Sequence, residues 1–139
     1  MKPFALSFDY TPKWKGNRGR EETDRITVRL RDFPHSKQLA LSEKLTSEFN
    51  SIDFAGSDET AKAKTISQSL ITLKKNNLDI SLGLVKKQFV SVSNLVVERE
   101  DGKEVKVETA DQLVEYCEEL AMELAARLVN GADADEIKN

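Results

Sequence analysis

The chain has 139 residues, of which 39% are hydrophobic and 32% charged, and its formal net charge is -3. This length fits one domain around a single hydrophobic core, and the composition excludes collagen-like and low-complexity proteins. No apolar run is long enough to cross a bilayer, and residues 1–10 alternate instead of forming a secretory signal. We therefore expect a cytoplasmic protein without membrane contact.

The charges are distributed unevenly along the chain. Residues 1–37 contain nine basic and five acidic side chains, whereas residues 98–139 contain five basic and 13 acidic ones. An acidic C-terminal third argues against a general nucleic-acid binder, because phosphate contacts need a broad basic surface.

Two early segments, residues 3–10 and 25–31, alternate between apolar and polar residues. The apolar positions are Phe4, Leu6 and Phe8 in the first segment and Ile26, Val28 and Leu30 in the second. A period of two predicts strands with one buried face, and we expect the two strands to pair across a loop at residues 11–24. Residues 25–31 also carry three arginines on the opposite face, which predicts a cationic outer surface.

Helical periodicity follows in the centre of the chain. Leu41, Leu45 and Phe49 recur every four residues and predict a helix over residues 36–50. Turn-forming residues at 53–58 separate it from a second predicted helix over residues 59–76. A third, shorter helix is predicted over residues 78–89, where Gly83 weakens the pattern.

The Asp101-Gly102 dipeptide lies between alternating β-forming residues and predicts a β-hairpin with a two-residue type I′ turn. Thr109 and Gln112 have the spacing of a capping box at the start of a last helix, expected to end near residue 130. Its apolar face consists of Leu113, Cys117, Leu120, Leu124 and Leu128. The predicted fold is therefore α+β, with one domain at residues 1–131 and a flexible acidic tail at residues 132–139.

Few side chains suggest catalysis. Cys117, the only cysteine, falls on the apolar face of the last helix, where a thiol is buried and unreactive. His35, the only histidine, lies at a turn and belongs to no triad pattern, and no nucleotide-binding or zinc-binding motif occurs. We expect no disulfide, no metal, no cofactor and no enzymatic activity.

The candidate binding residues are Trp14, Lys15, Arg18 and Arg20, in a glycine-containing basic loop at residues 14–20. Tryptophan and arginine dominate protein interfaces, so this basic loop is a candidate protein-binding site. The same residue types also stack on bases and neutralise phosphates. A third interpretation is that Trp14 folds back over the sheet while the cations remain solvated.

At this loop the chain resembles a known family. The segment Tyr10-Thr-Pro-Lys-Trp-Lys-Gly-Asn-Arg18, followed by the strand at residues 25–31, resembles the start of the small tail assembly chaperones of phages and prophages. Residues 93–98, the Asp101-Gly102 turn, residues 109–115 and the acidic end at residues 133–139 resemble their C-terminal half.

The resemblance implies a non-enzymatic role: such proteins bind the long, helical tape-measure protein and keep it soluble while the tail tube assembles. It implies the tape-measure protein as partner, with the tail tube protein and a second copy of the chain as further candidates, in the cytoplasm of a bacterial host. A tail or head-tail connector component that stays in the virion is a second hypothesis for the function, and an all-β, tail-tube-like domain is the alternative architecture. A small nucleic-acid-binding module using the basic loop is a third.

Overall fold

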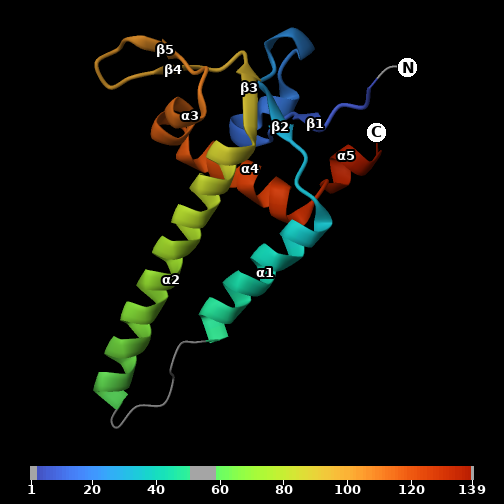
Figure 1. The fold of residues 1–139 in the computed structure, drawn as a ribbon. Helices are drawn as coiled ribbons and strands as arrows, with labels where there is room; N and C mark the ends of the chain where they lie inside the picture. The colour runs from blue at the N-terminus through green and yellow to red at the C-terminus, as the bar shows by residue number, and fades with distance from the viewer. Residues whose placement is uncertain (1–2, 51–58, 139) are drawn as a thin grey trace.

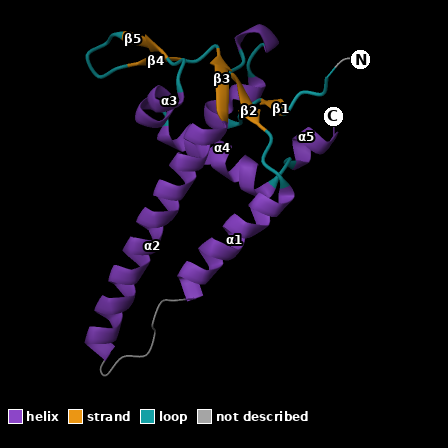
Figure 2. Ribbon diagram, viewed as in Figure 1, coloured by secondary structure: helices purple, strands orange, loops and turns teal. Residues whose placement is uncertain are grey.

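The computed structural model describes residues 3–50 and 59–138 and confirms the predicted α+β fold. Its strands lie at one end of the molecule, and two long helices extend from that end (Figures 1 and 2). The elements in chain order are β1 (Ser7–Tyr10), the 3₁₀ helices η1 (Trp14–Gly19) and η2 (Glu22–Asp24), β2 (Thr27–Arg31), α1 (His35–Asn50), α2 (Glu59–Gln88), β3 (Phe89–Ser93), β4 (Val96–Glu98), β5 (Glu104–Lys106), α3 (Ala110–Tyr116), α4 (Glu118–Asn130) and α5 (Ala134–Lys138).

The N-terminal sheet has three antiparallel strands in the order β1-β2-β3. The predicted β1–β2 pair is present, with Phe8 opposite Leu30. The prediction of a two-stranded element is incomplete, because β3 pairs with the other edge of β2 and places Val92 opposite Val28. Since β3 lies about 60 residues from β2 along the chain, local periodicity does not reveal this pairing.

The first strand is shorter than predicted. It begins at Ser7, so Phe4 and Leu6 precede it and are 95% and 77% exposed. The expectation that both residues belong to a buried face is therefore wrong. The ladder ends at the Ser7–Arg31 pair, beyond which the Asp32 amide donates to the Leu6 carbonyl at 3.0 Å, and the side chains of Phe4 and Leu6 extend past the end of the core.

One cluster of buried side chains joins the sheet to the C-terminal helices. This cluster contains Val28 and Leu30 of β2, Tyr10 of β1, Ile26 just before β2, and Val85 of α2. The C-terminal part of the chain contributes the remaining buried side chains, which are Leu95, Val107, Leu113, Cys117, Leu120, Ala121, Leu124, Ala125 and Leu128. The predicted apolar face of the last helix is thus confirmed residue by residue.

The second and third predicted helices form one continuous helix, α2, of 30 residues. It passes through Asn76, Asn77 and Gly83 without a break. A glycine costs a helix only about 1 kcal/mol, and this segment contains no proline to remove a hydrogen bond. The turn expected at residues 53–58 lies outside the described residues.

The last predicted helix is divided in two at Cys117, whose backbone (φ -135°, ψ 54°) is not helical. The capping box is confirmed: the Thr109 hydroxyl accepts from the Gln112 amide at 3.1 Å, and the Gln112 side chain accepts from the Thr109 amide at 3.2 Å. Because the chain bends at Cys117, α3 contacts α2 while α4 continues across both long helices. Within the described residues, no helix is both long and apolar enough to span a bilayer.

The hairpin is present, but its turn differs from the predicted type I′. The Arg99 amide donates to the Lys103 carbonyl at 2.8 Å, and the Gly102 amide donates to the Arg99 carbonyl at 2.9 Å. Gly102 has a positive φ of 83° and Asp101 does not, whereas a type I′ turn needs positive φ at both central residues. The connection is therefore a three-residue loop with glycine at its left-handed position.

Replacing Gly102 with Val should lower the free energy of unfolding by about 1 kcal/mol or more, because a β-branched residue resists a positive φ. Gly83→Ala is the control, since Gly83 lies within α2 and a Cβ there meets nothing within 4 Å. This control should leave stability unchanged or raise it. Urea denaturation of both variants tests the assignment, and an unchanged midpoint for Gly102→Val would contradict it.

Candidate functional site

The basic loop folds into η1, which is fixed to the sheet by a residue that the sequence patterns do not single out. The buried Asn17 donates from Nδ2 to the carbonyls of Pro12 (2.9 Å) and Ile26 (3.0 Å), and its Oδ1 accepts from the Ile26 amide at 2.7 Å. Lys15 and Gly16 both have positive φ, which turns the chain sharply just before this anchor. An asparagine beside glycine resembles an ordinary turn former, so its role becomes visible only in three dimensions.

Arg18 differs from the other three predicted residues because its side chain forms a hydrogen bond and ion pairs with other residues of the same chain. Its guanidinium donates to the Thr11 carbonyl at 2.8 Å and forms ion pairs with Asp133 (2.8 Å) and Asp135 (3.1 Å). It also lies 5.5 Å from the centroid of the Tyr10 ring. These contacts make Arg18 a structural residue of the fold.

The C-terminal segment, predicted as a flexible acidic tail, forms ion pairs with two arginines, Arg18 and Arg127. Residues 134–138 form α5, and Glu136 pairs with Arg127 at 2.9 Å while Asp133 pairs with Arg18. The hydrogen bond from Arg18 lowers the pKa of Asp133 well below its usual range. Carboxylates that would be solvated in isolation are therefore ordered by cations from distant segments of the chain.

Tyr10 belongs to the same polar cluster. Its hydroxyl donates to Glu123 of α4 at 2.7 Å, and the same carboxylate oxygen accepts from the Lys13 amide at 2.8 Å. Burial, together with this hydrogen bond, raises the pKa of Tyr10 above its ordinary value. Tyr10 therefore stays neutral and serves as a fixed donor between the basic loop and α4.

The other three predicted residues line one groove, here named the Trp14 groove, with a volume of about 410 Å³. Trp14 is half-buried and packs against the core, as expected if its ring folds back over the sheet. Its indole N–H has no acceptor in the described part of the chain. The Lys15 ammonium lies 5.0 Å from the Trp14 ring centroid. The lining residues are Trp14, Lys15, Asn17, Arg20, Ile26, Asn94, Leu95, Val96, Val97, Glu98 and Tyr116.

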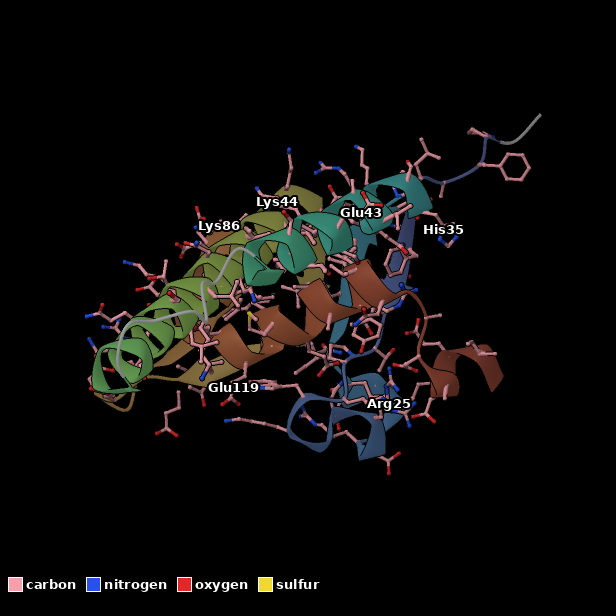
Figure 3. The ribbon with its side chains drawn as sticks, turned by 90° about the horizontal axis from the view of Figure 1, so that it is seen from below. Arg25, His35, Glu43, Lys44, Lys86 and Glu119 are labelled. Atoms are coloured by element: carbon pink, nitrogen blue, oxygen red, sulfur yellow. The ribbon has the colours of Figure 1, made fainter. Side chains whose placement is uncertain are left out.

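A second surface belongs to α1 and α2, here named the helix pair. Figure 1 shows both helices extending away from the sheet. Helix α4 crosses them near the ends that lie closest to the sheet. Leu39 of α1 and Ile71 of α2 are 62% and 66% exposed. Figure 3 places Glu43 and Lys44 on the outer side of α1.

The remaining reactive side chains are placed as the sequence predicts. Cys117 is buried, and burial raises the pKa of its thiol. His35 is exposed at the start of α1 (Figure 3). Over residues 3–50 and 59–138, no three His, Cys, Asp or Glu residues are grouped closely enough to hold a metal ion.

Comparisons of the chain with family models, with curated proteins and with solved structures find no match. What the protein binds is therefore inferred from its own surfaces, which are the Trp14 groove and the helix pair.

Replacing Arg18 with Met should lower the free energy of unfolding by about 1 kcal/mol at neutral pH, because Asp133 is left with the longer pair to Lys13 at 3.8 Å and Asp135 loses its pair with Arg18. The pKa of Asp133 is depressed in the folded state, so its stabilisation is present above the unfolded value of about 3.9 and is lost as the pH falls below it. Wild-type stability should thus fall more steeply below about pH 4 than that of Arg18→Met.

Arg20→Met is the matched control for this experiment, because no ion pair of Arg20 occurs among the described residues. Denaturation midpoints measured between neutral and acidic pH compare the three proteins. Equal midpoints for the two variants at every pH would show that the Arg18 pairs do not hold the C-terminal segment.

Cys117 should react slowly with a thiol reagent in the folded protein and rapidly in denaturant, because only the exposed thiolate is nucleophilic. Labelling followed by mass spectrometry, with and without urea, measures both rates. Rapid labelling of the folded protein would mean that α4 separates readily from the sheet.

Proposed function

We propose that the protein is a non-enzymatic phage or prophage tail assembly protein, a chaperone that binds the tape-measure protein through the helix pair. The observation that carries this proposal is the incomplete burial of the apolar side chains of α1 and α2. Among the described side chains, α1 has no fully buried residue, and Val85 near the C-terminal end of α2 is the one that α2 contributes to the core.

The apolar residues of the helix pair are half-covered or open. Leu41 and Leu45 of α1 and Leu73 of α2 are only partly buried, and Leu39 and Ile71 are largely exposed. An amphipathic surface of this kind is completed when another helix lays its own apolar residues against it. A long helical partner would therefore bury area that the single chain leaves in contact with water.

The resemblance to tail assembly chaperones supplies the identity of that helical partner, the tape-measure protein. The tail tube protein is a second partner of the same assembly, and self-association through the helix pair is a competing use of its surface. Such assembly would take place in the cytoplasm of the bacterial host. We propose no cofactor for this role, because binding of a helix requires apolar surface and no chemical step.

The two alternative functions differ from this one in measurable ways. A connector component would be found in mature particles at fixed stoichiometry, whereas a chaperone would be absent from them. A nucleic-acid module would need the cations of the basic loop, and Arg18 is already paired with two carboxylates. This pairing favours a protein partner over a nucleic acid.

Co-expression with a fragment of the tape-measure protein of the same tail module should keep that fragment soluble and give a complex on size-exclusion chromatography. Ile71→Glu and Leu39→Glu should weaken the complex by about tenfold or more, because each buries a charge where the partner helix packs. Ile137→Glu is the matched control, since Ile137 is 74% exposed but lies on α5, away from the helix pair.

Two results would contradict the proposal. One is a fragment that stays insoluble beside the wild-type protein. The other is a complex that all three variants form equally well, since this would place the partner on another surface.

A further inference from the structure

The Trp14 groove lies along β4, whose edge away from β5 pairs with no other strand among residues 3–50 and 59–138. In the β4–β5 ladder, Val97 lies opposite Val105, and the hydrogen bonds on either side of this pair join Arg99 to Lys103 and Val107 to Leu95. Hydrogen-bonded positions alternate along an antiparallel pair, so the N–H and C=O groups of Val96 and Glu98 point away from β5. The groove is lined by residues 94–98 and by no residue of β5, so it lies on the side of β4 that these groups point toward if they are to bind a partner.

The groove continues beyond the end of β4. A second cavity of about 520 Å³ is lined by Glu98, Arg99, Glu100, Asp101, Glu115 and Tyr116, and it shares Glu98 and Tyr116 with the Trp14 groove. Because they share these two lining residues, the two cavities adjoin each other, and together they are treated as one surface along β4 and the hairpin loop.

The charge changes sign along this surface. Lys15 and Arg20 line the part beside Trp14, and neither forms an ion pair with any residue that the structure describes. The part beside the hairpin loop has four carboxylates and one arginine, and that arginine already pairs with Asp101 at 3.6 Å. One end of the surface therefore attracts an acidic group and the other end a basic group.

We propose that this surface binds an extended peptide segment of a partner protein, which adds as a strand to the free edge of β4. The segment has an acidic residue at the end beside Lys15 and Arg20, apolar residues against Trp14, and a basic residue at the end beside Glu100 and Glu115. Backbone hydrogen bonds to Val96 and Glu98 supply the pairing, and the charged ends set its direction.

A strand fits this surface better than a nucleic acid does. Unpaired backbone donors and acceptors alternate along β4, which matches the backbone of another strand. The carboxylates at the hairpin end repel phosphates, and a single-stranded nucleic acid would have to pass them. The site is distinct from the helix pair, so the proposed tail assembly role does not depend on it.

Four capped synthetic peptides of about nine residues test the proposal, all with the central sequence Val-Thr-Val-Thr-Val. Their ends are Asp-Asp and Lys-Lys in either order, Asp-Asp at both ends, or Lys-Lys at both ends. One of the two mixed-charge peptides should bind the full chain at least about tenfold more tightly than both uniform ones, because each uniform peptide places a like charge at one end of the surface. Binding should shift the amide resonances of Val96 and Glu98 and change the fluorescence of Trp14, the only tryptophan.

Variants of Val96 separate strand addition from other modes of binding. Val96→Pro removes an N–H that points into the groove, at an edge position where proline is tolerated, and should weaken the preferred peptide by about tenfold or more at unchanged stability. Val96→Thr keeps the N–H and should bind normally. If Val96→Pro is destabilised, the same test can be made on the wild-type protein with synthetic peptides that are N-methylated at alternate backbone nitrogens. Two such peptides are needed, one methylated on each edge of the strand. Only methylation of the edge that faces β4 should abolish binding.

Arg20→Gln should remove the preference for the mixed-charge peptide over the one with two basic ends. The proposal is overturned if no peptide shifts the Val96 and Glu98 amides at about 1 mM, or if all four peptides bind equally. It is also overturned if both sets of methylated peptides bind like the unmodified one. A single-stranded oligonucleotide that shifts these amides at lower concentration than any peptide would assign the groove to nucleic acid instead.

Discussion

Helix α4 buries Leu120, Ala121, Leu124, Ala125 and Leu128 in the core, and the sheet and the other helices are arranged around this face. Each buried leucine stabilises the fold by about 1.5 to 3 kcal/mol relative to an exposed one. The same helix contacts α1, α2, α3 and η1. The elements that carry both candidate binding surfaces therefore depend on α4 for their positions.

The polar side of α4 fixes the beginning and the end of the described chain. Glu123 accepts hydrogen bonds from Tyr10 and from the Lys13 amide, while the Arg127 guanidinium lies 4.4 Å from the Phe8 ring centroid and pairs with Glu136. The Arg127 guanidinium therefore makes a cation–π contact with the ring and an ion pair with the carboxylate. Helix α5 is consequently tied to α4 by the Arg127–Glu136 pair although it buries little apolar surface of its own.

Patterns within a few residues predicted the parts of the fold that neighbouring residues determine. The period-two strands, the Thr109–Gln112 capping box and the burial of Cys117 follow from such patterns. The third strand and the docked α5 do not, since β3 pairs with a strand far away in the chain and Asp133 is held by Arg18, 115 residues earlier. Arg18 was predicted to bind a partner and Asp133 to lie in a flexible tail, because their pairing exists only in the folded chain.

The candidate site was predicted only in part for the same reason. Composition singled out Trp14, Lys15 and Arg20, which do line one groove. The other wall of that groove is β4, and a strand edge has no side-chain signature in the sequence. Whether backbone groups are left unpaired depends on which strands find partners, and this is decided by the whole fold.

Hydrogen bonds join α2 to the end of β2, where the helix pair leaves the sheet. Arg31 donates to the Lys87 carbonyl at 2.9 Å, and Gln88 donates to the carbonyls of Arg31 and Asp32 at 3.3 and 3.1 Å. These bonds join the end of β2, just before α1, to the last residues of α2. Because the two helices are tied together where they leave the sheet, their orientation does not require their apolar side chains to pack fully against each other. Those side chains remain partly buried or exposed, as the proposed binding of a partner helix requires, and they lie outside the buried core.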